Sequence, residues 1–237
     1  MNKPNPTGGN RMDILNKVKR YRKEEHELKW EGTFADYLAI VRERPIVAQM
    51  AHSRVYNMIN SSGLTERNGQ KLYHFFGEEI FGLESSIERL VEEYFHPAAK
   101  RLDVRKRILL LMGPVSGGKS SIVTLLKRGL ESYSKTDDGA VYAIKGCPMH
   151  EDPLHLIPQH LRADFTEEYG IRIEGSLSPL NTMRLEKEYG GRIEDVLVER
   201  ILFSEDKRVG IGTFTPSDPK SQDIADLTGS IDFSTIA

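Results

Sequence analysis

The chain has 237 residues, of which 38% are hydrophobic and 29% are charged, and such a composition can bury the core of one large α/β domain. Its formal net charge of −2 argues against a general nucleic-acid or membrane-surface binder. The single cysteine excludes an internal disulfide framework, and no apolar run approaches the roughly 18 residues of a membrane span. We therefore expect a cytoplasmic protein with neither a membrane nor a nucleic-acid partner.

The first segment changes character within about a dozen residues. Residues 1–11 are rich in Asn, Pro and Gly and have no periodic apolar positions, so we expect a disordered tail. From Asp13 the pattern is helical, with one apolar face formed by Ile14, Leu15, Val18 and Tyr21. We take residues 12–70 as a helical N-terminal extension and residues 71–237 as the main domain.

Two further helices are expected in the extension. Thr33 is followed three residues later by Asp36, the spacing of a capping box, which predicts a helix start at this point. Pro45 ends that helix and can occupy the first turn of the next, which runs toward Ile59. Residues 62–70 are expected to form a polar connection that contains Gly63 and Gly69.

The main domain begins with a predicted helix. Its apolar residues recur at helical spacing from Leu83 as far as His96-Pro97. The continuous apolar run 108–112 is bounded by basic residues and by Gly113, which suits a central strand of a parallel sheet. A helix from Ile122 to Leu130 follows, and then a second strand at 140–144. A strand, a helix and a strand in this order predict a βαβ unit, and hence a parallel sheet with flanking helices.

Beyond residue 146 we expect helices at 158–169, at 179–189 with Ser178 as the cap, and from 193 to 201. Short strands are expected at 171–174 and 208–214.

The strongest chemical signal is a phosphate-binding loop. Residues 113–120 match the pattern G-x-x-x-x-G-K-[ST] in full, between an apolar run and an amphipathic helix. Glycines let the backbone N–H groups converge on an anion, and the following helix adds its positive N-terminal dipole. Lys119 is expected to bridge the β- and γ-phosphates, and the Ser120 hydroxyl to hold Mg²⁺. We therefore expect ATP with Mg²⁺, contacted by Gly113, Pro114, Val115, Ser116, Gly117, Gly118, Lys119, Ser120 and Ser121.

A second cluster of residues could suggest a metal. Cys147, His150, His155 and His160 lie close together in the sequence. Their spacing matches no standard zinc pattern, and the prolines between them prevent one helix from aligning the histidines. We favour histidines in an ordinary loop.

Four segments resemble the N-terminal AAA domain of the PrkA-type serine protein kinases: LKWEGTFADYL, EEYFHPAAKRLDVRKRILLLMGPVSGGKSS, KGCPMHEDPLHLIP and GTFTPSDPKSQDIADLTGSID. The resemblance implies an AAA+-like P-loop NTPase fold, an unidentified protein substrate for serine/threonine phosphorylation by the full-length protein, and a homo-oligomeric ring. Gly82 resembles the glycine that precedes the P-loop in AAA+ proteins and lies against adenine. On that resemblance Phe81, Gly82 and Leu83 are candidate adenine contacts.

An alternative resemblance concerns the C-terminal end. Residues 221–223 and 227–232 are similar to a segment of magnesium chelatase ATPase subunits, which implies an AAA+ regulatory or remodelling ATPase without kinase activity. In AAA+ proteins this segment precedes the Walker B strand. We therefore expect the catalytic acid and the arginine finger to lie beyond residue 237, and assign no catalytic residue. On this interpretation the domain is truncated before Walker B and binds ATP with little turnover; Asp218 and Asp223 are the acids that could substitute.

Overall fold

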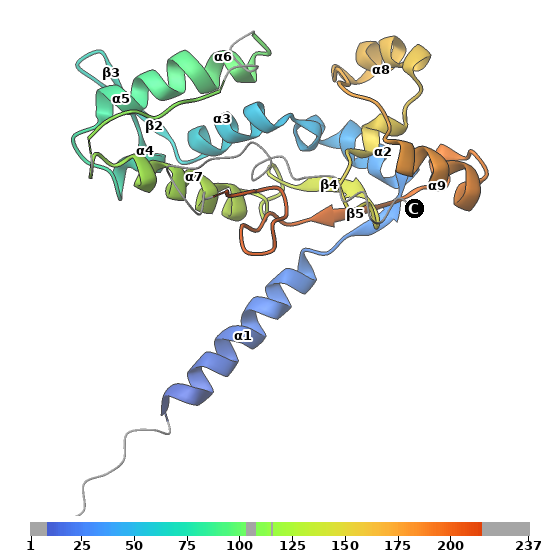
Figure 1. Ribbon diagram of the computed structural model, residues 1–237, viewed down its shortest axis with the longest axis horizontal. Coiled ribbons are helices and arrows are strands. Elements are labelled where there is room, and N and C mark those ends of the chain that lie inside the picture. Colours follow the sequence, from blue (N-terminus) through green and yellow to red (C-terminus); the bar gives the residue numbers. More distant parts are fainter. Residues whose placement is uncertain (1–8, 103–107, 115, 215–237) are drawn as a thin grey trace, which may run out of the picture.

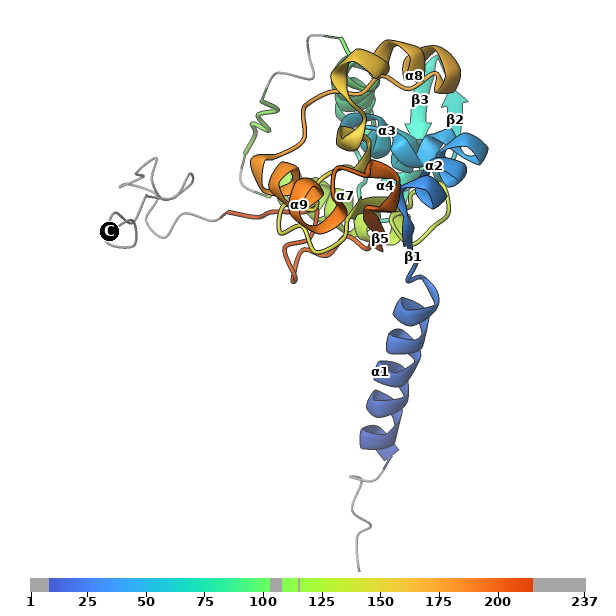
Figure 2. The same cartoon turned by 90° about the vertical axis from the view of Figure 1, so that its right-hand side faces the viewer.

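The computed structural model describes residues 9–102, 108–114 and 116–214 (Figure 1). A long helix, α1 (Gly9–Glu27), projects from a body that contains the other elements (Figures 1 and 2). The body has two halves, each with its own cluster of buried hydrophobic residues. We call these clusters the sheet core and the helical core.

The sheet half is built on a three-stranded antiparallel sheet in the order β1 (Glu31–Thr33), β5 (Leu197–Ile201), β4 (Val141–Ile144). In the register of this sheet Gly32 lies opposite Val198, and Ala143 lies opposite Glu199. The other elements of this half are α2 (Phe34–Glu43), η1 (Pro45–Ala48), η4 (Pro153–Leu156), η5 (Gln159–Leu161), α8 (Arg162–Tyr169), α9 (Pro179–Tyr189) and η6 (Ile193–Asp195). The sheet core consists of Phe34, Tyr37, Val41, Val47, Ala140, Ile144, Cys147, Leu154, Leu156, Ile157, Phe165, Ile171, Val196 and Val198.

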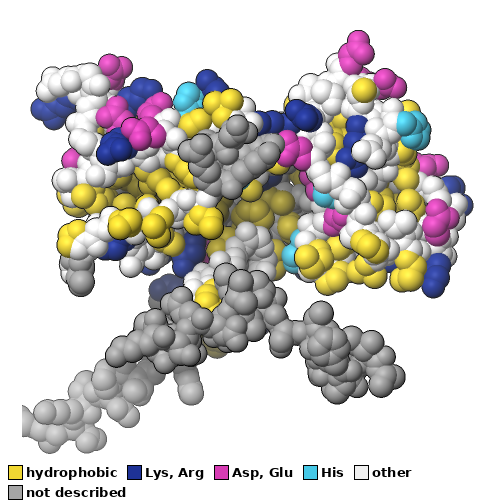
Figure 3. Space-filling view, turned by 45° about the horizontal axis from the view of Figure 1, so that its top comes forward, with side chains coloured by type: hydrophobic (Ala, Val, Ile, Leu, Met, Phe, Trp, Pro, Cys, Tyr) yellow, Lys and Arg dark blue, Asp and Glu magenta, His cyan; other side chains and the backbone are white. Residues whose placement is uncertain are grey.

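The helical half contains α3 (Ala51–Ser61), the hairpin β2 (Leu64–Arg67) and β3 (Gln70–Tyr73), α4 (His74–Gly77), α5 (Glu84–Arg89), η2 (Leu90–Phe95), α6 (His96–Ala99) and α7 (Lys119–Tyr133). The six residues of η2 are π-helical and join α5 to α6 without a break. The helical core consists of Met58, Ile59, Tyr73, Phe76, Ile80, Ile87, Val91, Phe95, Ile122 and Tyr133. Between the two halves the surface is hollowed, and hydrophobic side chains are exposed along the hollow (Figure 3).

One buried arginine connects the halves. Arg54, on α3, donates hydrogen bonds to the carbonyl oxygens of Gly139 (2.6 Å), Ala140 (3.1 Å) and Val47 (3.1 Å). Burial lowers the pKa of its guanidinium to about 10, so the group is still charged at neutral pH. Gly139 is required here, because a Cβ at this position would lie 1.8 Å from the carbonyl oxygen of Tyr133.

The elements predicted from capping signals are confirmed. The Thr33 hydroxyl accepts from the backbone N–H of Asp36 (3.2 Å), whose carboxylate accepts from the backbone N–H of Thr33 (2.8 Å), completing the capping box. Helix α9 has the predicted bounds, with Ser178 as its N-cap and Gly190 as a left-handed C-cap. Helix α8 lies within the predicted segment 158–169, and α7 contains the predicted helix 122–130 and extends it by three residues at each end.

The predicted parallel sheet is wrong for the part of the chain that is described. Its sheets are antiparallel, and β5 pairs with both β1 and β4. Residues 108–112 lie in no strand, and Ile108 is 94% exposed. The strand expected to pair in parallel with the first one, β4, pairs with β5 in the antiparallel direction, and residues 108–112 form no ladder with the described strands, so the expected βαβ unit is not seen there.

Other differences concern short segments. Residues 197–201 form strand β5 and not the expected helix. The apolar residues between 193 and 201 fit both a helical and a strand period, and the hydrogen-bonded pairing with β1 and β4 selects the strand. The strands expected at 171–174 and 208–214 are absent from those described residues, apart from a single bridge between Ser204 and Val209. Helix α1 already begins at Gly9, and the helix expected from Pro45 is divided into η1 and α3.

The hairpin β2–β3 begins within the polar connection expected at 62–70 and extends to Tyr73. Asn68 and Gly69, at its tip, both have left-handed backbones, with φ of 53° and 75°. An Asn-Gly pair is the preferred sequence of a two-residue hairpin turn, so this signal could have predicted the hairpin.

Candidate nucleotide-binding site

The loop before α7 curls back on itself. Ser116 and Gly118 have left-handed backbones, with φ of 63° and 76°, and the N–H of Gly117 donates to the carbonyl oxygen of Pro114 (3.2 Å). Gly118 is the N-cap of α7 and lies against Leu83, whose Cδ1 would be 2.9 Å from an added Cβ. A larger residue at position 118 would therefore meet both backbone strain and a steric clash. Val115 lies outside the described residues.

Lys119 is the first residue of α7, and its ammonium group lies within the curve of the loop. The ammonium donates to the carbonyl oxygens of Gly113 (2.9 Å) and Pro114 (2.5 Å). Ser120 and Ser121 follow on the first turn of α7, and both are exposed. The structure thus brings together a cation, two hydroxyl groups and the positive end of a fifteen-residue helix.

A groove of about 640 Å³ runs beside this loop. One wall comes from the helix that starts at α5, and the other from residues 109–114. Among its lining residues are Leu83, Arg89 and Tyr94, and we had predicted only the first of these. Arg89 is paired with Glu93 in the same wall (3.2 Å). The helical period from Leu83 through Leu90 could have indicated which side of this helix faces the loop.

The other two predicted adenine contacts lie differently. Phe81 is 76% exposed and lines a neighbouring cavity of about 400 Å³, together with His74 and Ile80. Gly82 has a left-handed backbone with φ of 76°, and its N–H donates to the carboxylate of Glu84 (3.0 Å). The structure therefore brings Leu83 to the P-loop groove, and it places Phe81 on the cavity next to it.

The far end of α7 is held by the sheet half. Arg200, on β5, donates through one nitrogen, Nη2, to the carbonyl oxygens of Ser134 (3.1 Å), Lys135 (3.0 Å) and Thr136 (2.9 Å). These carbonyls follow the last residue of α7 and have no partner within the helix. The helix that starts in the P-loop is thus fixed at its other end to the three-stranded sheet.

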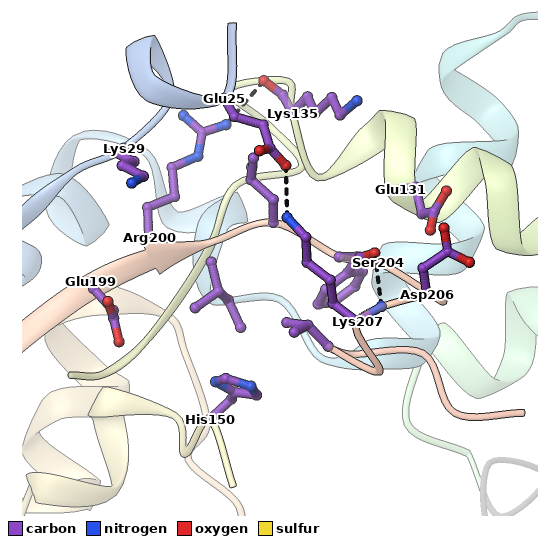
Figure 4. A pocket seen from close by; sticks show the side chains of 14 residues that line it. Glu25, Lys29, Glu131, Lys135, His150, Glu199, Arg200, Ser204, Asp206 and Lys207 are labelled. Carbon is purple, nitrogen blue, oxygen red and sulfur yellow. Dashed lines mark hydrogen bonds and ion pairs between the residues drawn. The ribbon is translucent and has the colours of Figure 1, made fainter. Parts of the chain in front are cut away.

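A separate cavity of about 490 Å³ lies between the end of α1, the end of α7 and β5 (Figure 4). Basic and acidic side chains line it together: Lys29, Lys135, Arg200, Lys207, Glu25, Glu131, Glu199 and Asp206. Because basic and acidic side chains line the cavity in equal number, its charge indicates no class of ligand.

Two members of the histidine and cysteine cluster, His155 and Cys147, take part in a hydrogen-bond network around Glu151. Glu151 is buried, and its carboxylate accepts from the Ser178 hydroxyl (2.6 Å), the Asn181 amide (2.5 Å) and His155 Nδ1 (3.1 Å). Burial alone would raise the pKa of Glu151, but these hydrogen bonds outweigh it and lower the pKa below its usual range. Cys147 contacts the same Asn181 amide (3.1 Å). No group of three potential ligands among the described residues could hold a metal ion.

Two further expectations concern membranes and the C-terminal end. Within the described ranges, the helices lack the length and hydrophobicity that a bilayer crossing requires. Asp218, Asp223 and the segment that resembles magnesium chelatase subunits lie outside the described residues.

Comparison with known proteins identifies the family. Residues 32–237 match the sequence model of a family described as "PrkA AAA domain". The chain is 80% identical over 226 residues to the "ATP-dependent protease PrkA" of Bacillus subtilis, which covers 95% of the chain and 36% of that relative. It is 34% identical over 163 residues to the "Serine/threonine kinase YeaG" of Escherichia coli K12, covering 65% of the chain and 24% of that relative.

The chain therefore spans about a third of the length of the Bacillus relative, and no solved structure matches it. AAA domains have the P-loop NTPase fold, in agreement with the loop, Lys119 and α7 described above. On the match over residues 32–237 and the identity to the Bacillus protein, this chain belongs to the PrkA AAA domain family.

Proposed function

We propose that this chain binds ATP with Mg²⁺ at residues 113–121. The observation that carries the proposal is the Lys119 ammonium, which lies within a curled loop at the N-terminus of α7. In the bound state the loop N–H groups hold the phosphates, Lys119 leaves the two carbonyls to contact the β- and γ-phosphates, and the Ser120 hydroxyl binds Mg²⁺. Bound Mg²⁺ would neutralise part of the phosphate charge, and the other contacts to the nucleotide would come from the chain.

The base is assigned to the groove beside the loop. Leu83 forms part of its wall and also contacts Gly118, so the same side chain is adjacent to the phosphate loop and to an apolar surface. Apolar walls with few polar groups are typical of sites for flat heterocycles. That Phe81 and Gly82 contact adenine remains a prediction. Phe81 lines the neighbouring cavity and would reach this groove only after the turn at Gly82 changes conformation.

The test is calorimetry with ATP, ADP and GTP in the presence of magnesium. We expect Lys119→Ala to weaken ATP binding by about 1.5–3 kcal/mol, the contribution of a charge-assisted hydrogen bond, which is roughly 10- to 150-fold in affinity. Lys187→Ala, an exposed lysine on α9, is the matched control and should leave the affinity unchanged. If Lys119→Ala binds ATP as tightly as the unmodified chain, the P-loop assignment is wrong.

For the longer protein we propose that ATP binding by this domain serves serine/threonine phosphorylation in the cytoplasm. The family resemblance and the name of the Escherichia coli relative, a serine/threonine kinase, support this activity. The name of the Bacillus relative, an ATP-dependent protease, supports a second candidate, ATP-dependent proteolysis. The third candidate is the regulatory or remodelling ATPase indicated by the chelatase-like segment.

One experiment separates these candidates. The full-length protein is incubated with labelled ATP and a protein mixture. Phosphoserine or phosphothreonine in a substrate supports the kinase, and fragments formed only with ATP support the protease. Phosphate release without either product supports the ATPase.

A further inference from the structure

The wall of the P-loop groove that comes from the α5–η2 helix has an apolar line and a polar edge. Leu83, Leu90 and Tyr94 line the groove and are half-buried. Arg89 and Glu93 line it as well, but both side chains are largely exposed, so they form the side of this wall that is nearer to solvent. The apolar line suits the flat face of a base, and the polar edge can hydrogen-bond to a neighbouring group of the same ligand.

Glu93 is the one acidic side chain among the described residues that line this groove, whose cations are Arg89 and Lys119. A carboxylate beside bound phosphates would weaken their binding by charge repulsion. Glu93 lies away from the phosphate loop, however. Leu83 contacts Gly118 of the loop, Arg89 follows about 9 Å further along the helix axis, and Glu93 is one turn beyond it. Glu93 is therefore placed to meet a part of the nucleotide other than its phosphates.

The ion pair leaves the Glu93 carboxylate with capacity for two more donors. Arg89 Nε donates to Oε1 of Glu93 (3.2 Å), and Arg89 Nη2 donates to Oε2 (3.5 Å). Each carboxylate oxygen has two lone-pair sites, so one site on each oxygen stays open. An ionised carboxylate accepts hydrogen bonds only, and a ligand that uses both open sites must therefore carry two adjacent uncharged donors. The 2′- and 3′-hydroxyl groups of a ribose are such a pair.

We propose that Glu93 accepts hydrogen bonds from the 2′- and 3′-hydroxyl groups of the bound nucleotide, so that the site selects ribonucleotides over deoxyribonucleotides. Arg89 is a positioning residue that holds the carboxylate in place. Helical side chains tilt toward the N-terminus, which brings the Glu93 carboxylate back toward the loop and within range of a sugar next to the phosphates. Carboxylates bind ribose hydroxyls in the same way in dinucleotide-binding folds. The inference rests on the proposed binding of ATP at residues 113–121.

Calorimetry with ATP, 2′-deoxy-ATP and 3′-deoxy-ATP in the presence of magnesium tests this assignment. The unmodified chain should bind each deoxynucleotide about tenfold more weakly than ATP, since each lacks one hydrogen bond to a charged acceptor. Glu93→Ala should bind all three nucleotides about equally. Arg89→Ala should reduce the preference only in part, because the acceptor remains and loses its support. Removing either charge changes the affinity for all three nucleotides alike, so the ratio of affinities reports on the sugar alone.

Glu79→Ala is the matched control. Glu79 is an exposed glutamate of the same half that pairs with an arginine, Arg128 (3.7 Å), and it does not line the groove, so this variant should keep the full preference for ATP. Equal loss of the preference in Glu79→Ala and Glu93→Ala would overturn the assignment of Glu93. Equal binding of the three nucleotides by the unmodified chain would overturn it too and leave the proposed ATP site intact. If the unmodified chain binds none of them, the proposed function is wrong and this inference falls with it.

Discussion

The two halves of the body differ in how their cores are assembled. In the helical half, most of the core comes from residues 58–95, which are close together in the sequence, and α7 completes it. In the sheet half, β1, β4 and β5 come from positions 31–33, 141–144 and 197–201, so the core depends on long-range pairing. The P-loop groove is lined by the helical half, while Arg54 and Arg200 join that half to the sheet half. One half thus provides the groove and loop where we propose that the nucleotide binds, and the other half fixes their position.

Replacing Arg54, which joins the two halves, is expected to have the largest effect on stability. We expect Arg54→Met to lower the free energy of unfolding by about 3–5 kcal/mol, because it leaves several buried carbonyls without a donor. Unfolding in urea is followed by the fluorescence of Trp30, which packs on Tyr142 in the sheet half, and by helical circular dichroism. Two separated transitions in the variant would show that Arg54 couples the halves.

The control for this variant is Arg42→Met, which removes an exposed ion pair with Glu168 and should cost no more than about 1 kcal/mol. If both variants destabilise the protein equally, the role assigned to Arg54 is incorrect.

Glu151 tests the sheet half alone. Glu151→Gln weakens the charge-assisted hydrogen bonds that hold the loop before η4 against α9, and we expect a loss of about 2 kcal/mol at neutral pH. The folded-state pKa of Glu151 is lowered, so its ionised form stabilises the fold above the ordinary value of 4.5, and this stabilisation is lost as the pH falls below that value. Urea unfolding of both proteins as a function of pH should therefore show a difference that narrows in acid. A difference independent of pH would point to packing and not to charge.

The capping box of α2 is expected to give the smallest effect. Thr33→Ala should lower the stability by about 1 kcal/mol, since it leaves a helix N–H group without its acceptor. Thr33→Ser keeps the hydroxyl and should recover most of this loss. Thermal unfolding of the three proteins makes the comparison, and an unrecovered loss in the serine variant would mean that the threonine methyl group matters more than the cap.

These differences also explain what could be predicted from the sequence. Ser178, Thr33 and Gly118 act through neighbours within a few residues, so their signals indicated the starts of α9, α2 and α7 correctly. The pairing of β5 with β1 and β4 depends on segments more than 50 residues apart, and no local pattern specifies it. In the candidate site, the loop pattern predicted the position of Lys119, and the helical period of residues 83–90 could have indicated which side of the α5–η2 helix faces the loop. The position of residues 109–114, which form the other wall of the groove, depends on contacts between distant segments and has no local signal.

The contacts of Arg200 also bear on the electrostatics of the phosphate loop. A helix of fifteen residues is about 22 Å long, so the guanidinium at its C-terminal end lies beyond the Debye length of about 10 Å from Lys119. Arg200 therefore adds almost no direct attraction for an anion. By binding the carbonyls of the three residues that follow α7 it holds the chain in place where the helix ends, and the aligned peptide dipoles extend along the whole helix. The sheet half thus stabilises the negative end of α7, while its positive end faces the loop where phosphate is proposed to bind.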